Sequence, residues 1–368
     1  MYKIAIIRFL INLEEPLNLT SRYKRFATVI IGGFILCALF GCRSANYPTD
    51  YEQLSEDERI VIRFSHVVGE DTPKGLAARK FAQLVKERSG GYVEVQVFSN
   101  GFLYKDGEEM EALLNGDVQM IAPAISKVTS LVPEWSVFDL PFAFDDYDEV
   151  HDYLAGPVGQ DLVSKFDSHG LLMLGMWDNG FKQFSNRDDP IRYPDDLKQL
   201  NMRIMPSDIL HKQFSIIGAI PKKIDFNVVF HHLENRDIDG QENTLSNITS
   251  KNLHMLQNHL TVSNHGYLGY VLLMNKEFWD KLPEDVKKLI LETLMEVSEW
   301  ERETARQLNA KNLAELEDCQ CIDIHYLTSD ERQTWEEAFK PVYDYFTERF
   351  GAKYVEMLPK NKGEIKPE

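Results

Sequence analysis

The sequence predicts an α/β protein of two lobes, each a mixed sheet flanked by helices, with a long connecting helix. Three observations support this fold class: strand-like and helix-like segments alternate, the alternation runs through two cycles, and a long amphipathic stretch follows the second cycle. The 368 residues have ordinary globular composition, without a sequence repeat or a low-complexity run, which fits one large two-lobed unit.

The first cycle begins with the apolar strand "RIVIRFSHV". In the next stretch, "TPKGLAARKFAQLVKERSGG", apolar residues recur at helical spacing until two glycines end the helix. "YVEVQVF" alternates as a strand, and "GEEMEALLNGDVQMIAPAI" predicts a helix followed by a buried strand. This order favours parallel strand pairs. We expect residues 60–178 to form lobe I, completed by about 264–310.

The second cycle runs from "GLLMLGMW" through "DLKQLNMRIMPS", "DILHKQFSIIGAI" and "DIDGQENTLSN", and it predicts lobe II over 179–263. The stretch that begins "PEDVKKLILETL" predicts a long amphipathic helix, with apolar residues of one face at Val286, Ile290, Leu294 and Val297. A last helix around "TWEEAFKPVYDYFTERFG" closes the fold. Part of the helical region 311–350 therefore completes lobe II, and 351–368 is a tail.

The N-terminal stretch "SRYKRFATVIIGGFILCALFGCRS" has the pattern of an export signal, because basic residues precede an apolar run from Phe26 to Gly41. Such a run is short for a transmembrane helix. The ending "LFGC" resembles a bacterial lipobox, so we expect 1–42 to be a lipoprotein signal, with an ordinary signal or an uncleaved anchor as alternatives. The polar segment 43–59 would tether an exported body, in the periplasm or on the outer face of the cytoplasmic membrane, through lipid-modified Cys42.

Charge limits the kind of partner. The chain has a net charge of −18, and residues 1–42, with five Lys/Arg and two Asp/Glu, contribute +3, which leaves −21 for the remainder. This acidity argues against nucleic acid or an anionic lipid surface as the partner. A small anion would have to be captured by a local basic cluster.

Signatures of catalysis or of a resident metal are missing from the sequence. It contains no Gly-x-Ser-x-Gly elbow, no His-Glu-x-x-His and no glycine-rich phosphate loop. His231 and His232, close to Glu234, make a poor metal site, because adjacent helical side chains point about 100° apart. Cys319 and Cys321 are two residues apart, which favours neither a relaxed disulfide nor a four-ligand zinc site. We therefore expect no enzyme activity, no cofactor, no metal and no role for these two cysteines.

The stretch "NMRIMPSD" places an arginine within a short apolar strand. Strand alternation puts Met202 and Ile204 on one face and Arg203 on the other, and a guanidinium is rarely buried without an anion. That anion is either a protein carboxylate or a ligand carboxylate, which a planar guanidinium matches with two hydrogen bonds. Lys127 and Lys182 each follow an apolar strand, the position where α/β proteins bind ligands.

Two α/β lobes, an export signal and a tether favour a solute receptor with its ligand between the lobes, and a secreted hydrolase is the main alternative. Seven short motifs, separated along the chain, carry a family resemblance. In chain order they are "FSHVVGEDTPKG", "LLNGDVQMIAPAISK", "VFDLPFAF", "RIMPSD", "DIDGQENTLSNITSK", "SNHGYL" and "FWDKLPEDVK". Over about 60–350 they resemble the substrate-binding proteins of TRAP transporters (the DctP-type family), and most of all the C4-dicarboxylate-binding subgroup. The resemblance implies a two-lobed, periplasmic-binding-protein-like fold that delivers a small carboxylate to the TRAP permease subunits in the membrane.

The resemblance also implies the ligand contacts. Arg203 matches the signature arginine that grips the substrate carboxylate. Lys182 matches the basic residue of the "NG-x-R/K-Q" turn, Lys127 matches a third basic position, and Asn243 matches the asparagine of "DGQEN". Looser matches to positions in the cleft are Ser207, Phe226, His66 and Lys74. Three basic residues would hold both ends of a dicarboxylate with one positive charge to spare.

Two blocks depart from the family pattern. "FNVVF" stands where "FSEVY" is usual, so Val228 replaces a glutamate that supports the cleft, and "FLYKDG" replaces the "QLG" turn at the cleft entrance. The expected ligand is succinate, fumarate or malate, and a uronate, another sugar acid or a 2-oxo acid is the alternative within the same fold. A tethered protein-interaction module is a further alternative.

Overall fold

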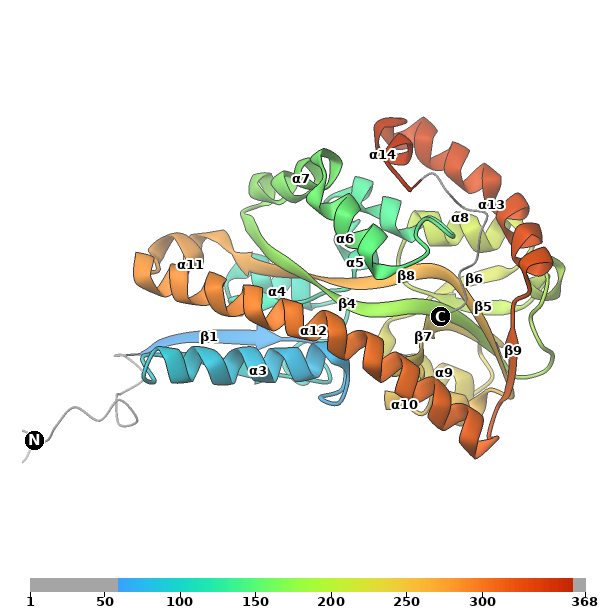
Figure 1. Ribbon diagram of the computed structural model, residues 1–368, viewed down its shortest axis with the longest axis horizontal. Helices are drawn as coiled ribbons and strands as arrows, with labels where there is room; N and C mark the ends of the chain where they lie inside the picture. Colours follow the sequence, from blue (N-terminus) through green and yellow to red (C-terminus); the bar gives the residue numbers. More distant parts are fainter. Residues whose placement is uncertain (1–58, 360–368) are drawn as a thin grey trace, which may run out of the picture. The chain divides into compact units, whose positions relative to one another are not determined.

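The computed structural model of the protein describes residues 59–359, and the predicted signal, Cys42 and nearly all of the tether lie outside them (Figure 1). The strands are β1 (Ile60–Ser65), β2 (Val93–Phe98), β3 (Met120–Ile121), β4 (Leu171–Asn186), β5 (Asn201–Ile204), β6 (Ile220–Lys223), β7 (Gly240–Thr244), β8 (His259–Asn275) and β9 (Asp323–Tyr326). The α-helices are α3 (Pro73–Arg88), α4 (Glu109–Asn115), α5 (Ile125–Val128), α6 (Tyr147–Ala155), α7 (Pro157–Ser164), α8 (Asp208–Ile216), α9 (Val229–Glu234), α10 (Leu245–Ser250), α11 (Lys276–Lys281), α12 (Glu284–Cys319), α13 (Ser329–Phe350) and α14 (Lys353–Glu356).

Two parallel sets of strands are joined by two long antiparallel strands. The sheet has the order β2-β1-β3-β8-β4-β7-β5-β6, with β9 paired to β8. β1 pairs in parallel with β2 and β3, and β5 pairs in parallel with β6 and β7. β4 and β8 pair antiparallel; β3 joins the C-terminal end of β8 and β7 joins the C-terminal end of β4. The predicted two-lobed α/β fold is confirmed, and the sheets of its two lobes are continuous; the exact lobe boundaries stay a prediction.

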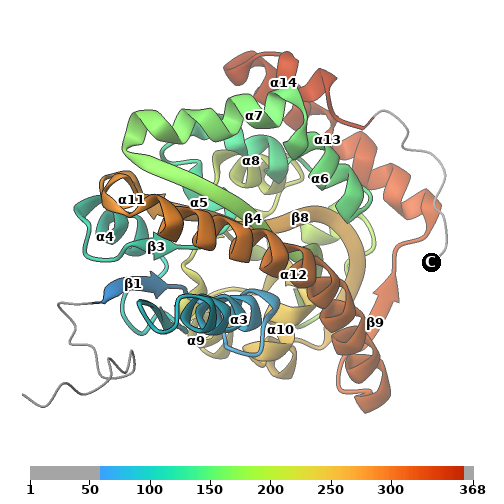
Figure 2. The same cartoon turned by 60° about the vertical axis from the view of Figure 1, so that its left-hand side comes forward.

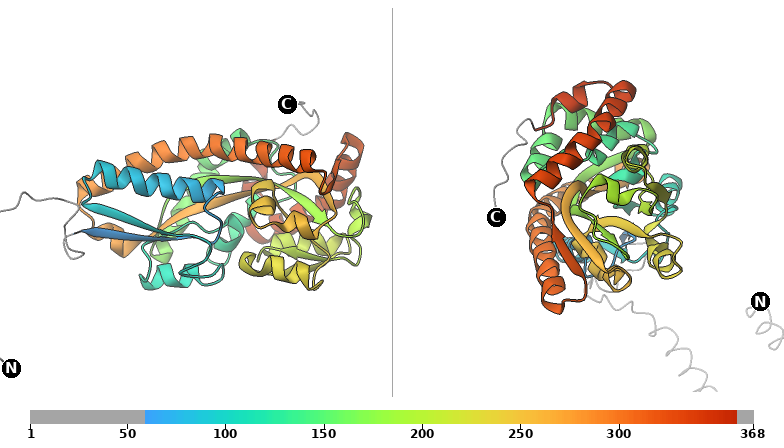
Figure 3. Two further views of the ribbon diagram at one scale, coloured as in Figure 1. Left: turned by 90° about the horizontal axis from the view of Figure 1, so that it is seen from below. Right: turned by 90° about the vertical axis from the view of Figure 1, so that its right-hand side faces the viewer.

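The long connecting helix is confirmed as α12, which runs without a break for 36 residues. It lies against α3 and β4 and also contacts α10 (Figures 1 and 2). Its buried Ile290 and Leu294 belong to a core cluster shared with β1 and α3, and Figure 3 shows α3 and α12 together over the strands. Because α12 contacts elements of both lobes, it links them along its length.

A second apolar cluster contains residues of α8 and α13. Phe184 of β4 lies 5.0 Å from Trp335 of α13 and 6.1 Å from Phe214 of α8, measured between ring centres. The aromatic packing fixes the end of β4 that carries the predicted site. Within residues 59–359, no helix combines the length and the apolar character needed to cross a membrane.

The prediction for the two C-terminal cysteines is wrong. Cys319 and Cys321 form a disulfide, with their Cα atoms 5.2 Å apart. α12 ends at Cys319, and Gln320 adopts left-handed backbone angles (φ 50°, ψ 30°) that turn the chain back on itself. The spacing alone does not reveal this turn, because residues other than glycine seldom have positive φ.

Candidate functional site

Neighbouring strands bring three of the predicted binding residues together. β5 pairs with β7 so that Arg203 lies opposite Gln241, and β7 pairs with β4 so that Asn243 lies opposite Gln183. Lys182 immediately precedes Gln183 on β4. The sheet order therefore places Arg203, Asn243 and Lys182 on three adjacent strands, as a shared ligand would require.

Arg203, unlike Lys127 and Lys182, forms no ion pair with a carboxylate of the described residues. It is 1% exposed, and its Nε donates a hydrogen bond to the Ile224 carbonyl at 2.9 Å. Within residues 59–359 its guanidinium makes no ion pair. Burial lowers the pKa of Arg203, and the carboxylates of Asp106, Glu242 and Asp225 oppose that shift from a longer range. Burying a guanidinium whose Nη groups have no partner costs desolvation free energy, unless an anion pairs with those groups.

Lys182, in contrast, has a partner inside the protein. Its Nζ lies 2.5 Å from Glu242 Oε2, and both side chains are buried. This contact is a buried ion pair. His265 Nε2 lies 3.2 Å from the same oxygen, and its Nδ1 lies 2.7 Å from Ser263 Oγ. Lys182, Glu242 and His265 thus form a buried polar cluster next to Arg203.

The pKa values of this cluster show its charge state. Burial alone would raise the pKa of Glu242, but the attraction of Lys182 and the hydrogen bond from His265 hold it at about 2. Burial lowers the pKa of His265 to about 4. At neutral pH the cluster therefore holds an ionised glutamate and a neutral imidazole.

Lys127 is also paired. Its Nζ lies 2.5 Å from Asp225 Oδ1 and 3.1 Å from Asp106 Oδ2. Lys127 and Lys182 therefore pair with three carboxylates, Asp106, Asp225 and Glu242. These three negative charges balance the charges of Arg203, Lys127 and Lys182, so the spare positive charge expected from the sequence is absent. An ammonium has three donors, so Lys127 keeps one for a ligand after pairing with two oxygens.

Lys74 and His66 come from lobe I. Lys74 Nζ donates to the Ala122 carbonyl at 2.7 Å and lies 3.7 Å from the centre of the Tyr270 ring. His66 is fully buried, and neither of its ring nitrogens has a hydrogen-bond partner within the described part of the chain. Burial lowers the pKa of His66 to about 3. This neutral imidazole has a donor and an acceptor available for a polar ligand.

The other predicted residues have contacts within the protein. Asn243 Oδ1 accepts a hydrogen bond from Asn247 Nδ2 at 2.9 Å, which orients its amide. Ser207 is the N-cap of α8, and its hydroxyl accepts from a backbone N–H of the first turn. Phe226 is buried, and its backbone N–H donates to Asp106 Oδ2 at 2.9 Å. These contacts fix the loops around Arg203.

The acidic partners were missed by the sequence reasoning. Glu242 stands inside the "DGQEN" motif, but no neighbour in the sequence shows that it faces Lys182. Asp106 and Asp225 come from loops far apart in the chain, and the fold brings both to Lys127. Within residues 59–359, no group of three His, Cys, Asp or Glu side chains is arranged to hold a metal ion.

The buried carboxyl of Glu109 predicts an unusual pH dependence of stability. Burial raises its pKa to about 8, against the attraction of Lys74 and the hydrogen bond that Ser65 donates at 3.0 Å. Between about pH 4.5 and 8 the folded chain keeps this proton and the unfolded chain releases it, so the free energy of unfolding falls as the pH rises through that window. The substitution Glu109→Gln should remove this slope in urea unfolding at pH 5 and pH 7.5. Exposed Glu111→Gln is the control, and an equal slope in both variants would contradict the assignment.

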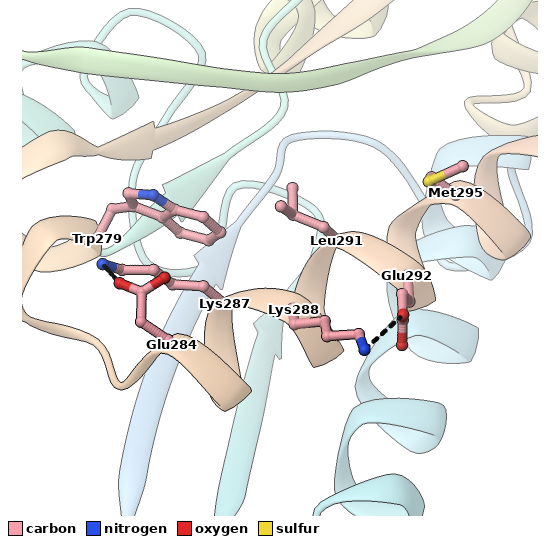
Figure 4. Close-up of a pocket in the computed structure, with 7 residues that line it drawn as sticks. All are labelled: Trp279, Glu284, Lys287, Lys288, Leu291, Glu292 and Met295. Carbon is pink, nitrogen blue, oxygen red and sulfur yellow. Dashed lines mark hydrogen bonds and ion pairs between the residues drawn. The ribbon is translucent and has the colours of Figure 1, made fainter.

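A surface cavity of about 430 Å³ lies between α11 and the start of α12 (Figure 4). It is lined by Trp279, Glu284, Lys287, Lys288, Leu291, Glu292 and Met295. Its two lysines form ion pairs with neighbouring glutamates, at 2.8 and 3.7 Å. Because its charges are paired and it shares no residue with the Arg203 cluster, this cavity is not a second candidate for the anion site.

Two α/β lobes joined by a long helix are the architecture of a two-lobed solute-binding protein. Residues 64–349 match the family described as bacterial extracellular solute-binding protein, family 7. The chain belongs to this family, and the TRAP-receptor resemblance seen in the sequence is confirmed.

Individual relatives agree with this assignment. The C4-dicarboxylate-binding protein DctB of Bacillus subtilis is 44% identical over 86% of this chain and 90% of its own length. A TRAP periplasmic solute-binding protein of Shewanella oneidensis, solved with bound succinate, is 40% identical with a TM-score of 0.80, over 81% of this chain and 98% of that one. A sugar-acid-binding protein of Advenella mimigardefordensis, solved with galactonate, is 31% identical with a TM-score of 0.79, over 81% of this chain and 96% of that one.

Proposed function

We propose that this TRAP receptor binds a C4-dicarboxylate such as succinate, fumarate or malate, and delivers it unchanged to the membrane subunits of a permease. The observation that carries the proposal is the buried guanidinium of Arg203, which has no carboxylate partner among the described residues. Its fork-shaped donors suit one ligand carboxylate. The curated relative named for C4-dicarboxylates and the succinate-bound structure support the same ligand class.

The second ligand carboxylate needs donors from the same region. Lys127 and Lys74 are cationic side chains with spare donor capacity there, and His66 offers an unpartnered ring N–H. Charge-assisted hydrogen bonds contribute about 1.5–3 kcal/mol each where water is excluded. Because these donors come from lobe I and Arg203 comes from lobe II, a ligand that contacts both sets stabilises the closed arrangement of the lobes.

A sugar acid is the second candidate within the same fold, since the galactonate-bound protein is 31% identical to this chain. A thermal-shift panel separates the candidates, because a ligand raises the midpoint in proportion to RT ln(1 + [L]/Kd). We expect succinate, fumarate or malate to raise the midpoint most. A larger shift with galactonate, glucuronate or a 2-oxo acid would favour the alternative. If no acid shifts the midpoint, the carboxylate-receptor proposal is wrong, and ester or glycoside turnover would then favour a secreted hydrolase.

We also propose that the exported chain is held at the membrane surface by a lipid on Cys42, which lies outside the described residues. The support is the run of basic residues, the apolar stretch and the terminal "LFGC". Labelling with radioactive palmitate should mark the native chain and leave Cys42→Ser unlabelled. Equal labelling of both chains would rule out this anchor.

A further inference from the structure

Two loops from opposite edges of the sheet meet over the candidate site. One follows β2 and the other follows β6, and these two strands end the main strand order. Asp106 N donates to Asn227 Oδ1 at 3.1 Å, and Phe226 N donates to Asp106 Oδ2 at 2.9 Å. Asn227 Nδ2 also donates to the Asn100 carbonyl at 3.3 Å. Asp106 thus donates to Asn227 and accepts from Phe226, so the two loops are joined in both directions across the lobes.

Charge and close packing reinforce this junction. Lys127, from lobe I, bridges Asp106 of its own lobe and Asp225 of lobe II. A Cβ atom at Gly101 would lie 2.6 Å from Asn227 Nδ2, and one at Gly107 would lie 3.1 Å from Asp225 Oδ2. The approach of the two loops therefore needs glycine at position 101 and leaves little room at position 107.

We propose that residues 100–107 and 225–227 form an interlobe clasp that retains the bound ligand, with Asp106 and Asn227 as its positioning residues. The proposal rests on the proposed carboxylate-receptor function. The clasp is placed to act on the ligand because Asp106 and Asp225 both contact Lys127, at 3.1 and 2.5 Å. It contacts Lys127, one of the proposed ligand-binding cations, so it should govern ligand release more than the first encounter.

Asp106 and Asn227 lie in the two segments, "FLYKDG" and "FNVVF", in which this sequence departs from the pattern of its family. Val228, in the second departure, is exposed and takes no part in the junction. Val228 therefore provides a matched control on the same short 3-10 helix, Phe226–Val228.

The variant Asn227→Ala removes two hydrogen bonds across the junction and no buried apolar contact. In stopped-flow measurements on the full-length chain, succinate should leave this variant about tenfold faster than the wild type, with the association rate nearly unchanged; two ordinary hydrogen bonds correspond to a change of this order. Val228→Ala should release succinate at the wild-type rate. Equal release rates for both variants would overturn the clasp.

A ligand-independent measurement separates failure of the clasp from failure of the ligand proposal. Pulsed electron paramagnetic resonance measures the distance between the lobes through two spin labels. The labels are attached at Lys86→Cys on α3 and Ser215→Cys on α8, both exposed positions. Asn227→Ala should lower the closed fraction relative to Val228→Ala, with or without succinate. If wild type binds no dicarboxylate, the ligand proposal fails and this comparison still tests the clasp. Equal closed fractions of Asn227→Ala and Val228→Ala, both with and without succinate, would overturn the clasp.

Discussion

Replacing Arg203 by alanine is expected to weaken binding of the best dicarboxylate by about 10²- to 10⁴-fold. The guanidinium is 1% exposed, and its Nη groups have no carboxylate partner among the described residues. In the proposed function the ligand supplies that anion. Two charge-assisted hydrogen bonds at about 1.5–3 kcal/mol each account for a loss of that size. Isothermal titration calorimetry measures it directly. Arg203→Lys should recover only part of the affinity, because lysine keeps the charge and loses the planar fork.

The matched control is Arg187, which also donates to a backbone carbonyl, that of Leu233 at 2.5 Å. Arg187→Ala should leave the dicarboxylate affinity nearly unchanged. Without ligand, Arg203→Ala should cost about 1 kcal/mol of unfolding free energy, the value of its single bond to Ile224. A structural arginine in a buried ion pair would instead cost about 3–5 kcal/mol. A large loss of stability with unchanged affinity would contradict the binding role.

Removing the carboxylate of Glu242 is expected to lower the free energy of unfolding by about 3–5 kcal/mol. In Glu242→Leu the ammonium of Lys182, whose side chain is 1% exposed, loses its only ion-pair partner in the described part of the chain. Urea unfolding at pH 7 measures the change. The double variant Lys182→Met with Glu242→Leu should regain most of the stability, because no unpaired charge then remains buried.

The Lys182–Glu242 pair also predicts that the protein loses stability in acid. Since Lys182 and His265 hold the pKa of Glu242 at about 2 against burial, its contribution to stability is present above its ordinary pKa of 4.5 and is lost as the pH falls toward 2. The exposed pair Lys276–Asp280 is the control, and Asp280→Asn should change stability by about 0.5 kcal/mol or less. If Glu242→Leu and Asp280→Asn have equally small effects, the buried pair does not stabilise the site.

Elements with a strong local pattern were predictable from the sequence. The apolar spacing of Ile290 and Leu294 predicts α12, and the strand around Arg203 appears as β5 with Met202 and Ile204 buried. Arg203 stands out because an arginine between apolar strand residues conflicts with the local pattern, and such conflicts are typical of functional sites.

Features that depend on distant residues were not predictable in the same way. Lys127 has the same sequence signal whether it is free or paired, and only the fold brings Asp106 and Asp225 to it. The continuity of the sheet depends on β4 and β8 extending through both lobes. The disulfide depends on the left-handed backbone of Gln320, a conformation that the residue type does not favour.

A crystal structure of the chain grown with succinate tests the central claim most directly. We expect one succinate carboxylate to lie about 2.7–2.9 Å from the guanidinium nitrogens of Arg203, the distance of a charge-assisted hydrogen bond. The second carboxylate should contact at least one of Lys74, Lys127 and Lys182. Succinate bound elsewhere, or an Arg203 that pairs with a protein carboxylate while succinate is present, would contradict the assignment of Arg203 as the ligand anchor.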